Sequence, residues 1–470
     1  MTTVRPISFV RFNALAGYCR QPQTLLYADE LNWFEKGGER VLATLIRDRA
    51  DGDFGGMILG RDRKGRFRWI GDAGFHPTQQ AAEAALRVHM DRLAAAPDAE
   101  YYQGDERGAP LNFFALRAAR ERLHANFLQL AEQEAFSAAR GIIAPMMHWY
   151  EDPDGNFIEQ FQTSGFDARL WELYLFATFV ELGYRIERVH AVPDFACVGV
   201  TGEFAVEAMT VNPTRDDMGA IVEPPPVETP DQVRAFLRDY MPIKFGSTLT
   251  SKLAKKYWEK PSAAGKPLLF AIQDFSAPAS MVLTHSALPV YLYGYDHDWE
   301  HDSGGELKIT PRKINSHRWG NKEIPSGFFD LPEAENISAV VFSNSGTLSK
   351  FNRMGVLAGF GSPRVVLVRQ GYAVDHNPDA VRPSSFRHVV NAPGYRETWG
   401  EGLNVFHNPR AKHPLVPCML PGAAHHTLLP GGQLESHTPG WHPLASLTCV
   451  VVADDEAQAR RLVTEGVPQA

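Results

Sequence analysis

The middle of the chain has the clearest pattern of hydrophobic and polar positions. Apolar residues recur at helical spacing in FDARLWELYLFATFVELG (166–183), which predicts a helix with Ser164 as its N-cap and Gly183 at its end. Short apolar or alternating runs follow and predict three strands: YRIERVHAV (184–192), DFACVGV (194–200) and EFAVEAMTV (203–211).

Two helices and a strand are predicted next. DQVRAFLRDYM (231–241) favours a short helix, and Ser247 is placed to cap a second helix over residues 247–260. PLLFAIQDF (267–275) is almost wholly apolar, which is typical of a buried strand. The predicted order over residues 166–275 is therefore helix, three strands, helix, strand.

The flanking regions have weaker patterns. Residues 40–95 predict a three-stranded meander followed by a helix, residues 96–110 a polar linker, and residues 111–140 one long amphipathic helix. We therefore expect an α/β protein in three regions. These are a small N-terminal α/β domain (1–100), a central core (110–280) and a β-rich C-terminal extension of the core sheet (281–470).

Composition narrows the class of protein. The chain has 470 residues, 44% of them hydrophobic, and a net charge of −8, which argues against broad binding of polyanions. Its four cysteines form no CxxC pair, so we expect neither a structural zinc site nor a disulfide framework. The N-terminal stretch has no apolar run long enough for a signal peptide, and no run of eighteen apolar residues occurs, so neither a signal peptide nor a membrane span is expected. A cytoplasmic protein without a membrane partner is expected, and its oligomeric state is left open.

Two carboxylates interrupt the apolar strand segments. Glu207 lies inside VEAMTV and shares a strand face with Met209, while Asp194 begins the preceding strand. If these strands are neighbours, the two acids approach each other, which is costly unless a cation joins them. Oxygen ligands favour Mg²⁺ or Mn²⁺. Glu172, among apolar neighbours on the preceding helix, is a third candidate ligand.

These residues in this order resemble the PD-(D/E)xK nuclease superfamily. Pro193-Asp194 matches the PD pair, Glu207-Ala208-Met209 occupies the ExK triplet, and Glu172 matches the helix acid. The resemblance covers roughly residues 160–275, about a quarter of the chain. It implies a restriction-endonuclease-like α-β-β-β-α-β core and metal-dependent hydrolysis of phosphodiester bonds in nucleic acid. DNA is favoured over RNA as the partner.

Met209 departs from this motif, because a methionine cannot supply the charge of the family's lysine. Some members of the superfamily take the lysine from the following helix. The stretch 237–260 has six basic and two acidic residues. Lys252 is our first candidate and Lys244 the second. Lys256 is the third, since a helix through 260 would place it on one face with Lys252 and Lys255.

Other interpretations stay open. Each candidate residue also has an ordinary explanation. Asp194 could be a turn residue, Glu207 an edge-strand residue facing water, and Glu172 and the lysines solvated helix residues. With Met209, the core could be an inactive nuclease-fold module that only binds partners. The histidine-rich C-terminal region, including His425 and His426, could instead belong to an unrelated hydrolase. The acidic stretch 295–308 is better explained as an exposed loop than as a metal site. The sequence has no nucleotide-binding glycine motif and no serine-hydrolase spacing.

Overall fold

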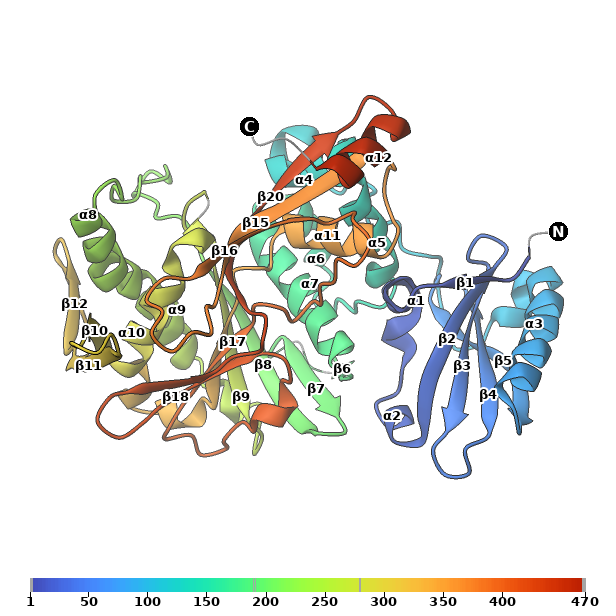
Figure 1. Cartoon of the computed structure of the whole chain (residues 1–470), viewed down its shortest axis with the longest axis horizontal. Coiled ribbons are helices and arrows are strands. Elements are labelled where there is room, and N and C mark those ends of the chain that lie inside the picture. Colours follow the sequence, from blue (N-terminus) through green and yellow to red (C-terminus); the bar gives the residue numbers. More distant parts are fainter. Residues whose placement is uncertain (1–2, 189, 191, 279, 467–470) are drawn as a thin grey trace.

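The computed structural model describes residues 3–188, 190, 192–278 and 280–466. Its N-terminal unit is a five-stranded antiparallel sheet in chain order, formed by β1 (Arg5–Ile7), β2 (Ala28–Lys36), β3 (Val41–Asp48), β4 (Phe54–Arg61) and β5 (Phe67–His76). α3 (Gln79–Ala95) covers one face through Leu86 and Met90, and α1 (Phe9–Ala16) packs on the other through Phe12 (Figure 1). The predicted strands β3–β5 and helix α3 are confirmed, whereas the sequence interpretation missed β1 and β2.

An eight-stranded mixed sheet forms the centre of the molecule. Its spatial order is β19-β18-β17-β14-β9-β8-β7-β6, and β8, β9 and β14 run parallel in its middle. The strands are β6 (Arg185–Glu187), β7 (Phe195–Gly199), β8 (Gly202–Val211), β9 (Leu268–Asp274), β14 (Ala339–Phe342), β17 (Asn404–His407), β18 (Ala424–Leu428) and β19 (Leu434–His437). The C-terminal half of the chain thus adds strands to the sheet that the middle begins.

The predicted order of elements over residues 166–275 is confirmed. α7 (Phe166–Glu181) is followed by β6, β7 and β8, then by helix, then by β9. Two details differ: the N-cap of α7 is Gly165 rather than Ser164, and β6 ends at Glu187, well short of the strand predicted to residue 192. Residues 189 and 191 of that predicted strand lie outside the described residues.

The second helical segment is longer and earlier than predicted. α8 (Pro230–Ala235), a π-helical turn (Phe236–Tyr240) and α9 (Met241–Leu253) follow one another without a break. Ser247 therefore lies inside α9, where its hydroxyl donates to the Ile243 carbonyl at 2.9 Å, and the prediction that it caps a helix is wrong. Because α9 ends at Leu253 and Lys256 has a left-handed backbone, Lys252, Lys255 and Lys256 do not share a helical face.

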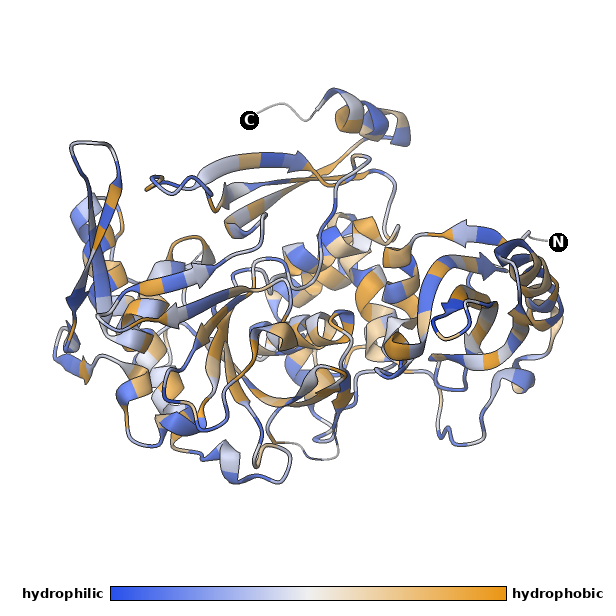
Figure 2. Ribbon diagram, turned by 60° about the horizontal axis from the view of Figure 1, so that its bottom comes forward, coloured by the Kyte–Doolittle hydropathy of each residue, from blue (hydrophilic) through white to orange (hydrophobic). Residues whose placement is uncertain are grey.

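Helices cover both faces of the central sheet. α7, α5 (Ser137–Met147) and α11 (Leu348–Leu357) pack on one face around Trp171. α9 and α10 (Ala287–Tyr293) pack on the other around Phe245 and Tyr291. Figure 2 shows the hydrophobic residues gathered on the inner strands and on the helices packed against them. No helix of the described residues is long and apolar enough to cross a membrane.

The single helix predicted over residues 111–140 is wrong. The segment instead contains a 3-10 turn (Arg120–Arg122), α4 (Ala125–Glu132) and the start of α5. The buried side chain of Gln162 accepts from the Arg117 N–H at 2.8 Å and donates to the Phe113 and Ala115 carbonyls. These bonds hold the backbone of 113–117 outside a helix, and sequence periodicity contains no sign of them.

The C-terminal region also forms a second layer beside the main sheet. β15 (Val365–Ala373) pairs with β16 (Ser384–Val389) and β20 (Pro443–Val452), and α12 (Glu456–Glu465) packs on β15. Two hairpins complete the region: β10 (Tyr295–His301) with β11 (Leu307–Lys313), and β12 (Ser316–Trp319) with β13 (Lys322–Pro325).

Candidate active site

Asp194 lies directly before β7, at the point where this strand meets β8. The register pairs Phe195 with Val206, so the next position along sets Asp194 opposite Glu207. The Oδ2 atom of Asp194 accepts the Ala208 backbone N–H at 2.8 Å. Asp194 therefore lies just outside the strand that the sequence assigns to it, and its carboxylate is fixed against the backbone of the adjacent strand β8, which carries Glu207.

Glu207 is buried on the α9 side of the sheet. Strand alternation sends Ala205 and Met209 into the core shared with α9, while Val206 and Ala208 face α7. Glu207 shares the face of Ala205 and Met209, and it is 5% exposed. An ionised carboxylate at this depth requires a polar or cationic partner.

Lys252 supplies that cation. It lies in the last turn of α9, and its Nζ atom forms an ion pair with Glu207 Oε1 and contacts the Ala208 carbonyl at 3.5 Å. The Tyr257 ring flanks the pair, with its centroid 5.8 Å from Lys252 Nζ. Met209 itself is 5% exposed and packs in the apolar core. The amine that the strand lacks thus reaches Glu207 from the following helix.

Glu172 lies on the opposite, α7 side of the sheet. Arg169 Nη1 donates to both of its carboxylate oxygens at 2.7 and 2.9 Å, and the Tyr150 hydroxyl donates to Oε2 at 2.9 Å. Arg188 in turn donates to the Tyr150 hydroxyl at 2.8 Å. A cavity of about 20 Å³, close to the size of one water molecule, lies between these residues and Asp194. Glu172 therefore faces Asp194, but its charge is already neutralised by Arg169.

Electrostatics single out Asp194 among the three acids. Burial raises its pKa well above the usual range, and the neighbouring Glu207 and Glu172 carboxylates raise it further. The Ala208 N–H and Lys252 act in the opposite direction. Burial also raises the pKa of Tyr257, with a contribution from Glu207. Asp194 is thus a buried acid near two others, a setting that a bound cation would relieve.

The other predicted lysines have different partners. Lys244 Nζ donates to the Asn212 carbonyl at 2.7 Å and to Thr214 Oγ1 at 2.9 Å, and burial lowers its pKa. Lys256 pairs with Glu333 at 2.6 Å. Lys255 is exposed. Of the candidate lysines, the structure brings only Lys252 to Glu207.

The sequence interpretation missed the residues that hold Glu172. Arg169 lies three positions before Glu172, a spacing at which helical side chains meet, so this pair could have been found. Tyr150 and Arg188 are distant in sequence and had no comparable signal.

Comparison with known proteins gives no further guide to this site. No family model, curated protein or solved structure matches the chain. Function must therefore be inferred from the site.

The donor set offers limited room for a metal ion. Across the described ranges, no group of three or more histidine, cysteine, aspartate or glutamate side chains is arranged to hold one. Asp194 and Glu207 remain as a pair, with Asp194 Oδ2 engaged by Ala208 and Glu207 Oε1 by Lys252. Both are oxygen donors, the type of ligand that a hard cation such as Mg²⁺ or Mn²⁺ prefers in proteins.

The two other polar clusters of the sequence are accounted for separately. Residues 295–308 lie in the β10–β11 hairpin, so the prediction of a loop is wrong; Arg312 of β11 pairs with Asp296 at 2.6 Å and with Asp298 at 3.1 Å. In the C-terminal histidine cluster, His407 contacts His425 at 2.9 Å. Burial lowers the pKa of His407 to about 4 and that of His426 to about 3, so both rings are neutral at pH 7.

Proposed function

We propose that this protein is a metal-dependent phosphodiesterase acting on nucleic acid, with DNA as its first substrate to test. One observation carries the proposal: Lys252 of α9 reaches Glu207, next to Asp194, on the strand that lacks a lysine at position 209. An amine and two carboxylates at adjoining strand positions are the groups that phosphodiester hydrolysis uses.

Each residue of the candidate active site has a role in this proposal. Asp194 and Glu207 would hold Mg²⁺ or Mn²⁺, which when bound polarises a phosphate and lowers the pKa of a water. Lys252 keeps a positive charge at the place where the phosphate oxygens gain negative charge. The Ala208 N–H fixes the Asp194 carboxylate in position, so little reorganisation is needed when substrate arrives. Glu172 adds negative charge near the proposed cation site, and the ion pair with Arg169 partly neutralises the Glu172 carboxylate.

A cleavage assay tests the proposal directly. Supercoiled plasmid, single-stranded DNA and RNA would be incubated with the protein in Mg²⁺, in Mn²⁺ and in EDTA. We expect metal-dependent cleavage that Glu207→Gln and Lys252→Met each reduce at least a hundredfold, the scale of one electrostatic group at a reacting centre. Lys255→Met is the matched control, since Lys255 is an exposed lysine three residues further on. Cleavage by Glu207→Gln at the wild-type rate would refute the assignment.

A second candidate function is a nuclease-fold module that binds without cutting. The observation that favours it is the pairing of acids with cations of the chain: Lys252 occupies Glu207, and Arg169 with Tyr150 occupies Glu172. Calorimetric titration with Mn²⁺ separates the two functions. Heat of binding that Asp194→Asn removes supports the enzyme, whereas no binding by the wild type supports the module.

A further inference from the structure

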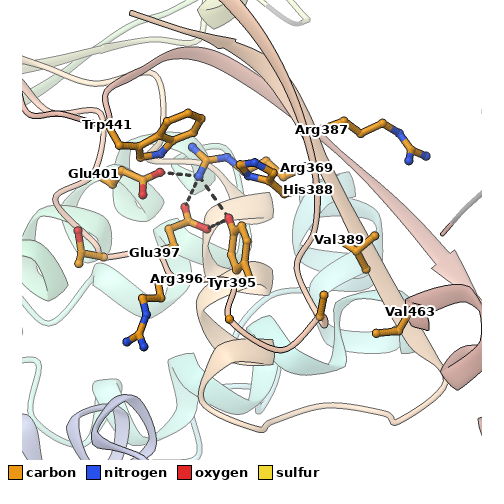
Figure 3. Close-up of a pocket in the computed structure, with 13 residues that line it drawn as sticks. Arg369, Arg387, His388, Val389, Tyr395, Arg396, Glu397, Glu401, Trp441 and Val463 are labelled. Carbon is orange, nitrogen blue, oxygen red and sulfur yellow. Dashed lines mark hydrogen bonds and ion pairs between the residues drawn. The ribbon is translucent and has the colours of Figure 1, made fainter. Parts of the chain in front are cut away.

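A second cavity lies away from the candidate active site. It has a volume of about 690 Å³ and is formed by β15, β16, the segment 392–401 and Trp441 (Figure 3). Pockets for small molecules and cofactors fall in the range of ~300–1,000 Å³. The space is therefore large enough for a nucleotide-sized group.

Aromatic rings form one wall of this cavity. Trp441 contacts Phe386 at a centroid distance of 5.0 Å and His388 at 5.6 Å, and His388 lies 6.1 Å from Tyr395. Trp441 is 41% exposed although it is large and apolar. An exposed ring held in place by other rings is a stacking surface for a planar ligand.

A buried arginine forms the base of the cavity. Arg369 is 1% exposed, and its Nη1 donates to Glu401 at 2.5 Å and to the Tyr395 hydroxyl at 3.3 Å. Its Nη2 has no hydrogen-bond partner among the described residues. Since a buried donor without a partner is costly, this nitrogen marks a place where a ligand acceptor is missing.

Positive charge predominates among the lining side chains. Arg369, Arg387 and Arg396 line the cavity together with two carboxylates, Glu397 and Glu401. Figure 3 shows Arg387 and Arg396 pointing away from the buried ion pairs, on either side of them. Arg396 is exposed and has no partner within the described chain. These features suit a ligand that combines planar rings with negative charge.

Two further cations lie behind the cavity. Lys350 and Arg353 of α11 contact Glu397 at 2.7 and 2.8 Å, and both are buried. They neutralise the most deeply buried carboxylate of the wall. The acids that line the cavity therefore do not repel an anionic ligand strongly.

We propose that this cavity binds single-stranded nucleic acid, with unpaired bases stacked on Trp441 and His388 and a phosphate held by Arg396. Arg369 Nη2 then donates to the ligand. A duplex hides the faces of its bases, so stacking selects a single strand. This inference rests on the proposed function and deepens it, because it names the form of substrate that the protein holds.

The chain also connects this cavity with the candidate active site. The backbone N–H of Trp399, in the cavity-lining segment, donates to Glu181 at the end of α7 at 2.6 Å. Glu172 lies nine residues earlier on the same helix, about 14 Å along its axis at ~1.5 Å per residue. The segment that lines the cavity is thus bonded to the helix that carries Glu172.

Binding measurements in the Glu207→Gln background, which prevents cleavage, test the inference. Fluorescence anisotropy would follow a labelled single strand of about 12 nucleotides, within the usual site sizes. A duplex of the same sequence and an unlabelled mononucleotide are added as competitors. The variants are Trp441→Ala and Arg396→Ala. Their matched controls are Trp69→Ala, which removes another half-exposed tryptophan, and Arg107→Ala, which removes another exposed arginine.

We expect Trp441→Ala to weaken single-strand binding roughly five- to fiftyfold and the controls to change it less than twofold. Arg396→Ala should weaken binding and reduce its salt dependence by about one phosphate contact. Equal loss of duplex binding in Trp441→Ala, displacement by the mononucleotide at equal concentration, or no difference from the controls would each overturn the inference. Trp441-dependent binding by a protein that cleaves no nucleic acid would refute only the proposed function. In the protein with Glu207 intact, cleavage that is unaffected by Trp441→Ala and Arg396→Ala would refute only this inference.

Discussion

Replacing Glu397 by glutamine should destabilise the protein strongly. The Glu397 carboxylate is buried and accepts from Lys350 at 2.7 Å, from Arg353 at 2.8 and 2.9 Å, and from the Tyr395 hydroxyl at 2.7 Å. Arg369 lies 3.4 Å from it. One negative charge thus balances three buried cations, and only Arg369 has a second carboxylate, Glu401, in contact.

The magnitude follows from this arrangement. Removing one partner of a buried ion pair costs ~3–5 kcal/mol, because the remaining charge is left without compensation. Glutamine keeps the shape of Glu397 but has no charge, and its amide N–H₂ faces donors of Lys350 or Arg353. We therefore expect the free energy of unfolding to fall by about 4 kcal/mol at neutral pH.

The effect should also depend on pH. Burial alone would raise the pKa of Glu397, but Arg353, Lys350 and Arg369 outweigh it and hold this pKa well below the usual range. A carboxylate with a depressed folded-state pKa stabilises the protein above its unfolded pKa of about 4.3. This contribution is lost as the pH falls from there through the folded-state pKa. The gap between wild type and Glu397→Gln should shrink over that acid range.

Urea denaturation followed by tryptophan fluorescence measures the difference, at pH 7 and then stepwise into the acid range. Glu456→Gln is the control, since this glutamate is exposed and pairs only with Arg460 on the surface. A change within about 0.5 kcal/mol of wild type for Glu397→Gln, the range of ordinary surface substitutions, would refute the reasoning. A difference that stays constant as the pH falls through the acid range would contradict the electrostatic cause.

Three further predictions concern the candidate active site. Asp194→Asn should raise the free energy of unfolding in EDTA at pH 7. Because the folded-state pKa of Asp194 is raised, its ionisation destabilises the folded protein as the pH rises above about 3.9, and asparagine cannot ionise. Urea denaturation should therefore show a larger gain at pH 7 than at pH 4. Lys252→Met should lower the free energy of unfolding by about 1–3 kcal/mol, since it leaves Glu207 buried without its cation, and the loss should largely disappear in Lys252→Met/Glu207→Gln. Mg²⁺ at about a hundred times its Kd should stabilise wild type by ~2.7 kcal/mol and should not stabilise Asp194→Asn, as thermal unfolding with and without the ion would show.

Much of the central fold could be predicted from the sequence, because its elements have strong local patterns. α7, β8 and β9 are buried on all sides over most of their length, as their nearly continuous apolar runs indicate. The sequence analysis expected Asp194 to approach Glu207 if their strands are neighbours, and the register of β7 and β8 in the structure brings the two positions together. The ends of helices were harder to predict. Ser247 is a residue type that commonly caps a helix, yet it lies inside α9, where its hydroxyl donates to a backbone carbonyl one turn earlier.

The cavity beside β15 could not be predicted in the same way. Arg369, Glu397 and Trp441 come from separate parts of the chain and share no spacing or motif. Their meeting depends on pairing of β15 with β16 and β20, which brings distant segments together. Local patterns contain no record of such contacts, so a buried ion network of this kind is visible only in the folded chain.

The position of Lys252 has a physical reason that joins sequence to structure. Residues 207 and 209 alternate onto the same face of β8, so a lysine at 209 would have approached Glu207 from the α9 side. The core on that side is apolar around Met209, where a lysine amine would be buried among Phe245 and Ile272. Lys252 reaches Glu207 from the same side, but its side chain is 24% exposed, so the charge keeps contact with water. A lysine on the helix thus meets Glu207 from the same face as a lysine at 209 would, without the cost of burying its amine.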